Sequence, residues 1–159
     1  MNVEKRLEEL GIELPDFGSE TYYGATYGKM KPFHLVGNVL HLSGHIPEVD
    51  GEVVHPGRLG ATVTLEQGYE AARLTGINVL AGLRQALGDL DRVRSLIKSL
   101  NFVVCEPDFY DVHKVSSGLT DLLAKVFGDA AGIGCRATIG VQSLARNNCF
   151  ETWLSAEVR

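Results

Sequence analysis

Two long segments of the chain repeat apolar residues every three or four positions, the period of a helix that buries one face. The first begins after Thr64, which has the capping-box spacing with Gln67, and continues to Gly88. Its other face carries the charged residues. The second segment is predicted to be helical from about residue 108 to residue 127, and its apolar stripe is expected to cover the same sheet.

Shorter apolar runs around these helices have the spacing of strands. Residues 35–44 (LVGNVLHLSG) contain two such runs, and Gly and Asn at 37–38 predict a tight turn between them. In residues 93–105 apolar positions lie two or four apart, which is typical of a strand buried on one face. Residues 135–158 predict two more strands, joined by a polar turn near 145–148.

The remaining segments complete a single-domain organisation. A short amphipathic helix is predicted at residues 3–10, ended by Gly11, and residues 1–20 are expected to form an accessory helix and loop. Glycines and prolines in residues 47–60 predict a surface loop. The element order predicts one domain over residues 1–159 of the α/β (α+β) class, with a mixed β-sheet and two long helices packed on one face.

A sheet that helices cover on one face only has a second face to bury or solvate. Association between copies of the chain is the simplest way to bury it. We expect such an interface to include apolar residues of the strands, namely Val39, Leu42, Ile139 and Phe150.

Composition narrows the classes of function. The 159 residues are 45% hydrophobic, enough for one core, and their net charge of −5 includes no Lys/Arg run that could follow a phosphate backbone, so no nucleic-acid partner is expected. No apolar run approaches the roughly 20 residues of a membrane span, and the first residues lack the apolar stretch of a secretory signal. The three cysteines have no CxxC spacing and are expected to be buried or partly buried reduced thiols, which favours the cytoplasm.

Three stretches of sequence resemble the Rid/YjgF family. They are GNVLHLSGHIP at 37–47, EQGYEAARLTGINVLAGLRQALGDLDRV at 66–93, and CRATIGV at 135–141 followed by FETWLSAEV at 150–158. The resemblance covers nearly the whole chain. It implies a chorismate-mutase-like fold that assembles as a homotrimer, with ligand clefts between neighbouring subunits.

Arg136 and Glu151 are the candidate catalytic residues. The guanidinium of Arg136 presents a fixed fork of donors that matches a carboxylate, and the resemblance implies that it anchors the carboxylate of the substrate. Glu151 follows at the spacing that the resemblance implies for a glutamate that positions water, whose carboxylate accepts the proton of that water. The alternatives are a strand-end arginine paired with a surface glutamate, and a glutamate that faces solvent.

The resemblance places four further residues in the cleft as substrate-binding residues. Glycine allows close approach of a ligand, and a backbone N–H there can donate a hydrogen bond. The four residues are Ser43, Gly44, Tyr27 and Thr138. Extra residues before the first strand leave Tyr22 or Tyr23 as alternatives to Tyr27, and a plain turn is the alternative for the Ser-Gly pair.

The chain departs from the best-known members of the family at four positions of the cleft. Thr138 stands in place of a reactive cysteine, Pro107 in place of an asparagine, His45 in place of a glutamine and Gly140 in place of a glutamate. These departures leave the substrate range open. A cleft that is inactive, or that binds a different substrate, is therefore an alternative.

The sequence therefore predicts a deaminase that hydrolyses reactive enamines or imines to 2-keto acids and ammonia. Its partner would be a small carboxylate-bearing imine or keto acid, without a membrane or nucleic acid. A non-catalytic trimeric module that binds small carboxylates is the alternative, and an endoribonuclease fits the acidic balance poorly. No cofactor is expected, because nucleotide-binding and serine-hydrolase motifs are absent, and no metal is expected, since His41 and His45 lack further ligands at zinc spacing.

Overall fold

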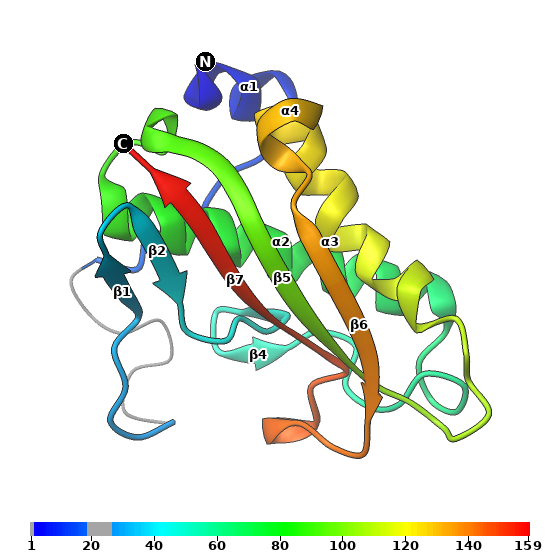
Figure 1. Cartoon of the computed structure of the whole chain (residues 1–159). Coiled ribbons are helices and arrows are strands. Elements are labelled where there is room, and N and C mark those ends of the chain that lie inside the picture. The colour runs from blue at the N-terminus through cyan, green and yellow to red at the C-terminus, as the bar shows by residue number, and fades with distance from the viewer. Residues whose placement is uncertain (1, 19–26) are drawn as a thin grey trace.

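The computed structural model describes residues 2–18 and 27–159 (Figure 1). Its helices are α1 (Val3–Glu9), α2 (Leu65–Leu87), α3 (Val112–Phe127) and α4 (Asp129–Gly132), with short 3₁₀ turns at Leu90–Arg92 and Ala145–Asn147. Its strands are β1 (Phe33–Val36), β2 (Val39–Leu42), β3 (Glu48–Val49), β4 (Glu52–Val53), β5 (Val93–Val104), β6 (Cys135–Val141) and β7 (Phe150–Val158). Within the described residues, no helix combines the length and the apolar composition that a membrane span requires.

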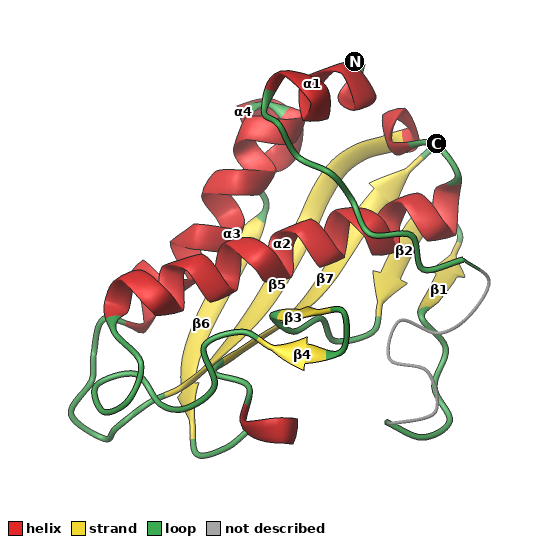
Figure 2. Ribbon diagram, turned by 180° about the vertical axis from the view of Figure 1, so that it is seen from behind, coloured by secondary structure: helices red, strands yellow, loops and turns green. Residues whose placement is uncertain are grey.

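Five strands form one mixed sheet in the order β1-β2-β7-β5-β6, and β3 pairs with β4 in a small separate hairpin. All neighbours in the large sheet are antiparallel except β5 and β6, which are parallel. Helices α2 and α3 cross the same face of this sheet (Figure 2). The predicted α+β class and the two covering helices are therefore confirmed.

Local sequence signals explain where most elements begin and end. Thr64 and Gln67 form the predicted capping box at the start of α2, and Gly88 ends that helix with a φ of 75°. Gly37, with a φ of 60°, makes the two-residue turn between β1 and β2. After α1, Gly11 takes a φ of 65° and its N–H bonds to the carbonyl of Glu8.

Two structural predictions need correction. Helix α3 begins at Val112 and not near residue 108, because residues 106–111 form a turn in which the N–H of Phe109 bonds to the carbonyl of Glu106. Phe109 has the apolar spacing of the helix, but it is a loop residue that packs on the core. The surface loop expected over residues 47–60 contains the β3–β4 hairpin. The two strands predicted in residues 135–158 are present as β6 and β7, and β5 lies between them in the sheet.

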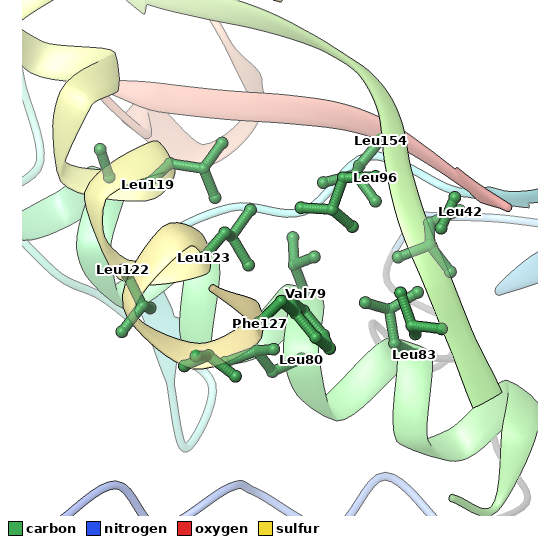
Figure 3. Packing of buried hydrophobic residues seen from close by; sticks show 14 of the residues in the cluster. Leu42, Val79, Leu80, Leu83, Leu96, Leu119, Leu122, Leu123, Phe127 and Leu154 are labelled. Atoms are coloured by element: carbon green, nitrogen blue, oxygen red, sulfur yellow. The ribbon is translucent and has the colours of Figure 1, made fainter. Parts of the chain in front are cut away.

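The core lies between the helices and the sheet (Figure 3). Leucines of α2 and α3 pack with Phe127 against side chains from the strands, including Leu42, Leu96 and Leu154. The two helices cross closely, because a Cβ at Gly118 would lie only 2.0 Å from the carbonyl oxygen of Tyr69. This close crossing explains why a glycine stands in the middle of α3.

The other face of the sheet has no helix over it in the described part of the chain, and we call it the open face. Its centre consists of side chains in register on β5, β6 and β7, namely Leu100, Phe102, Ala137, Ile139, Glu151, Trp153 and Ser155. Of the four predicted interface residues, Ile139 is 46% exposed, but Leu42 and Phe150 belong to the core. Those two predictions were wrong because alternate strand residues point to opposite faces.

The cysteines differ in their surroundings. Cys149 is buried and Cys105 is half-buried, as predicted, and burial raises the pKa of the Cys149 thiol to about 11. Cys135 is exposed, against the prediction, because it begins the edge strand β6.

Candidate functional site

Arg136 lies on the edge strand β6 and reaches toward the side of α3. Its guanidinium donates to the hydroxyl oxygens of Thr120 over 3.0 Å and Ser117 over 3.4 Å, and to the carbonyl oxygen of His113 over 3.4 Å. Among the described residues, none of the ion pairs includes Arg136. In the described residues Arg136 is therefore not paired with a surface glutamate, which was the alternative. Neutral oxygen atoms of α3 accept the hydrogen bonds of its charged guanidinium.

Thr138 lies two residues further along β6, on the same side of the strand as Arg136. Its hydroxyl is 2.7 Å from the hydroxyl of Ser116, which lies on α3. Arg136 and Thr138 thus form one group, placed where β6 meets α3.

Glu151 lies on the central strand β7, and its side chain is half-buried on the open face. Its carboxylate oxygen Oε2 accepts a hydrogen bond from the indole Nε1–H of Trp153 over 2.6 Å. Burial raises the pKa of the Glu151 carboxyl, and the hydrogen bond from Trp153 lowers it by less. A carboxylate in this state is a stronger base than an ordinary glutamate.

Gly44 lies beside this carboxylate. A Cβ at Gly44 would be 2.9 Å from the Oε2 atom of Glu151 and 3.2 Å from the Nε1 atom of Trp153. The glycine therefore allows the two side chains to occupy the space next to the end of β2. Ser43 precedes it and donates its hydroxyl to the carbonyl oxygen of Lys31.

The side chain of His45 hydrogen-bonds to the backbone of the Ser-Gly pair. Its ring Nδ1 is 2.8 Å from the carbonyl oxygen of Ser43, and the ring is buried beneath Gly82 of α2. Burial lowers the pKa of His45 to about 4, so the ring is neutral near pH 7 and its Nδ1–H donates to the carbonyl. His41, in contrast, pairs with the hydroxyl of Ser155 on the open face.

The predicted catalytic pair is divided between the two faces of the sheet. In the register of the strands, Arg136 is opposite Ser99 and Glu151 is opposite Phe102 of the same strand β5. Positions 99 and 102 differ by an odd number, so their side chains point to opposite faces. One chain therefore brings Glu151 together with Gly44, and Arg136 together with Thr138, but not the two groups with each other.

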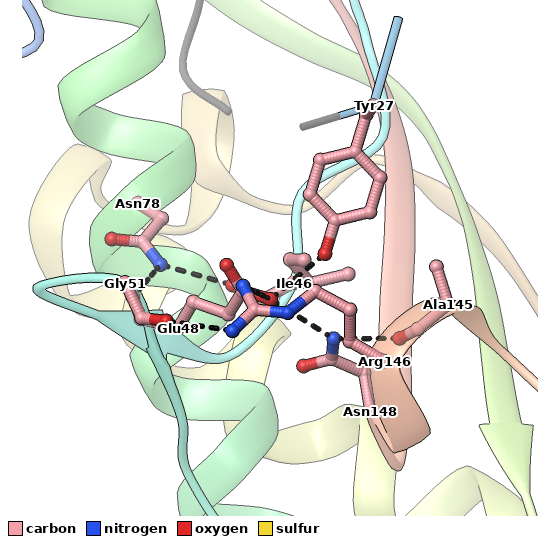
Figure 4. Close-up of polar contacts among 8 residues, drawn as sticks. All are labelled: Tyr27, Ile46, Glu48, Gly51, Asn78, Ala145, Arg146 and Asn148. Atoms are coloured by element: carbon pink, nitrogen blue, oxygen red, sulfur yellow. Dashed lines mark hydrogen bonds and ion pairs between the residues drawn. The ribbon is translucent and has the colours of Figure 1, made fainter. Parts of the chain in front are cut away.

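Tyr27 belongs to neither group. Its hydroxyl donates to the Oε1 atom of Glu48 over 2.9 Å, and the same oxygen accepts from Arg146 over 3.0 Å and from Asn148 over 3.3 Å (Figure 4). This cluster ties the turn before β7 to the β3–β4 hairpin. Tyr22 and Tyr23, the alternatives for a cleft tyrosine, lie outside the described residues.

The open face is hollowed next to the Glu151 group. A depression of about 450 Å³ is lined by residues of β2, β5, β7 and the Ser-Gly pair, among them His41, Ser43, Gly44, Lys98, Trp153 and Ser155. Across residues 2–18 and 27–159, no group of three or more His, Cys, Asp or Glu side chains could hold a metal ion.

Trp153 is a residue of the candidate site that has no predicted role in the sequence analysis above. A signal was present, because Trp153 follows Glu151 by two positions in a predicted strand, and residues two apart share a face. An indole N–H next to a carboxylate on one face predicts a hydrogen bond between them.

Known proteins with similar sequence and structure confirm the predicted chorismate-mutase-like fold. Residues 4–158 match the model of a family described as "YjgF/chorismate mutase-like, putative endoribonuclease". Among curated proteins, the chain is 35% identical to protein TCP17 of Trypanosoma cruzi over 142 residues, which cover 89% of this chain and 85% of that protein.

Two solved structures are similar over almost the whole length. Protein Atu1372 of Agrobacterium tumefaciens, of unknown function, is 34% identical with a TM-score of 0.87, and the match covers 99% of this chain and 94% of that one. A protein of Shewanella oneidensis with the same endoribonuclease label is 31% identical with a TM-score of 0.90, and the match covers 99% of this chain and 100% of that one.

Proposed function

Because the chain belongs to the YjgF/chorismate mutase-like family, we propose that it hydrolyses small imines or enamines that carry a carboxylate, releasing 2-keto acids and ammonia. The observation that supports this most directly is the state of Glu151. Its carboxylate is half-buried, has a raised pKa, and is held by Trp153 beside a glycine. These are the properties of a positioned general base.

The proposed reaction uses water as its only co-reactant. Glu151 orients a water molecule and takes one of its protons while the oxygen attacks the carbon of the protonated imine, which gives a neutral carbinolamine. The protonated Glu151 then returns the proton to the nitrogen. As the C–N bond breaks, the carbinolamine hydroxyl gives its proton back to the Glu151 carboxylate, which leaves a keto acid and ammonia. An imine is already electrophilic, so positioning supplies much of the acceleration that is needed.

In this proposal the cleft is shared between two copies of the chain. Arg136 and Thr138 of one copy face Ser43, Gly44 and Glu151 of the next, so that the guanidinium binds the carboxylate while the imine carbon lies near the base. The division of Arg136 and Glu151 between two faces of the sheet supports a shared cleft over one within a single chain. Apolar exposure on the open face, with Trp153 at 52% and Ile139 at 46%, supports association there.

A binding module without catalysis is the second candidate. Two contacts favour it: the Thr138 hydroxyl pairs with Ser116, and the Arg136 guanidinium already bonds three oxygens of α3. In that case the protein would bind a small carboxylate and release no ammonia.

The deciding experiment supplies freshly generated 2-iminopropionate, or an imine with a bulkier side chain, and follows ammonia release against the rate in buffer. Under the proposal the parent protein accelerates release and the Glu151→Gln variant is slower by about 10²-fold or more. Parent protein that binds pyruvate but leaves the buffer rate unchanged would identify the binding module instead.

A further inference from the structure

Trp153 is the one tryptophan in the sequence, and it contacts the proposed base directly. Its indole Nε1–H donates to the Oε2 atom of Glu151 over 2.6 Å. The indole itself packs against the ring of Phe102 on β5, with ring centroids 4.8 Å apart and planes tilted by 56°. This tilted aromatic contact fixes the orientation of the N–H donor.

Gly44 lies close to the same oxygen of the carboxylate and to the indole nitrogen. The Glu151 side chain lies in the space that a Cβ of Gly44 would occupy, 2.9 Å from Oε2 and 3.0 Å from Cδ. The carboxylate thus contacts both the indole N–H and the backbone at Gly44. A glutamate with free rotation about its side-chain bonds would instead sample several positions.

The chemical nature of the donor matters as much as its position. An arginine or lysine at position 153 would also hold the carboxylate, but its charge would lower the pKa of Glu151 strongly and make it a weaker base. An indole N–H carries no charge, so it holds the carboxylate and leaves most of the effect of burial in place.

We propose that Trp153 is a positioning residue for Glu151, which holds Oε2 through its indole N–H and leaves Oε1 to take the proton of the attacking water. The inference rests on the proposed deaminase function. Other titratable groups on this face include His41 on β2 and Lys98 on β5, both opposite Ser155, four positions from Glu151 along β7. The strand registers add three more, namely His34, Cys135 and Glu157.

Trp153→Phe tests the inference, because it keeps a ring against Phe102 and removes the N–H. We expect kcat to fall on the order of ten-fold with KM for the imine nearly unchanged. The acid limb of the pH–rate profile should also move to higher pH, because the hydrogen bond that lowers the pKa of Glu151 is lost. A variant with the kcat and the pH profile of the parent would overturn the inference.

The single tryptophan also provides a readout that needs no activity. Fluorescence of Trp153 in the parent should change as Glu151 titrates, with a midpoint above the ordinary carboxyl value of 4.5, and this transition should be absent in Glu151→Gln. His41→Gln, which removes the neighbouring histidine, should retain it. Identical titrations of the parent and Glu151→Gln would overturn the contact between Trp153 and Glu151. A parent protein that shows the titration but releases no ammonia would instead overturn the proposed function, and with it the catalytic role of this contact, but not the contact itself.

Discussion

Arg136 on β6 and Glu151 on β7 belong to the same sheet but point to opposite faces of it. The guanidinium lies against α3, whereas the carboxylate lies on the open face beside Gly44. A small molecule bound to Arg136 cannot reach Glu151 of the same chain through the sheet. The proposed function therefore depends on a second copy of the chain.

A mixing experiment follows from this division. Arg136→Ala and Glu151→Gln should each be inactive alone. Refolding an equal mixture into the homotrimer that we expect should recover about a quarter of the parent activity, because about a quarter of the interfaces would pair an intact arginine with an intact glutamate. Ammonia release from the mixture measures the recovery. If the mixture is as inactive as the two variants alone, Arg136 and Glu151 do not act together in a site that two chains share.

Arg136→Ala should weaken the binding of pyruvate or 2-ketobutyrate by on the order of 2–3 kcal/mol, because a charge-assisted pair with the carboxylate is lost. The fold should persist, since the side chain is exposed. Titration calorimetry measures the affinity, with Arg94→Ala as the matched control, because Arg94 is an exposed arginine of β5 that pairs with Glu157. Equal affinities for the two variants would contradict the anchoring role.

Glu151→Gln should stabilise the protein near neutral pH while it removes activity. The raised pKa of Glu151 means that the folded state binds the proton more tightly than the unfolded state, so the parent loses stability as pH rises through that pKa. The neutral amide avoids this loss. Thermal melts should show a higher Tm for the variant at pH 7, and the difference should disappear at pH values below about 4, where both states of the parent are protonated.

His45 should contribute to the acid sensitivity of the fold. Its pKa is lowered from 6.5 to about 4 in the folded state, so its contribution to stability is complete above pH 6.5 and is lost as pH falls toward 4. His45→Gln, which keeps an N–H donor for the Ser43 carbonyl, should remove a loss on the order of 3 kcal/mol over this range. Urea unfolding at pH 7 and pH 4.5 tests this, and an unchanged pH dependence would argue against it.

Gly118→Ala should destabilise the protein by about 1–3 kcal/mol or more, because the added methyl group overlaps the backbone of α2 at Tyr69. Lys114→Ala is a suitable control on the same helix, where the lysine side chain is 55% exposed. Its effect should stay within about 0.5 kcal/mol. Equal unfolding midpoints for the two variants would mean that α2 and α3 separate easily.

Local patterns in the sequence predict most of the fold. The capping box at Thr64 and the apolar stripe after it place α2 correctly, and Gly37 marks the turn between β1 and β2. These signals depend on residues a few positions apart, so they are complete in the sequence. The pairing of β7 with both β2 and β5 depends on residues that are far apart in the chain. The local pattern of β6 and β7 therefore does not indicate that β5 lies between these two strands.

The candidate site is predictable only in part for the same reason. The residue types and spacing of Arg136 and Glu151 indicate their chemistry, but their faces depend on the register with β5. The place of Tyr27 also depends on tertiary contacts that the sequence does not contain. Its hydroxyl bonds to Glu48, a residue of the β3–β4 hairpin that is 21 positions away in the chain.

The position of β7 in the sheet has a consequence for synthesis on the ribosome. Strand β7 lies between the β1–β2 hairpin and the β5–β6 pair, yet it is translated after all of them. Until residues 150–158 leave the exit tunnel, the nascent chain has two separate sheet fragments with unpaired edges on β2 and β5. Such edges pair readily with other chains, so this interval is when we expect a chaperone to protect the newly made protein from aggregation.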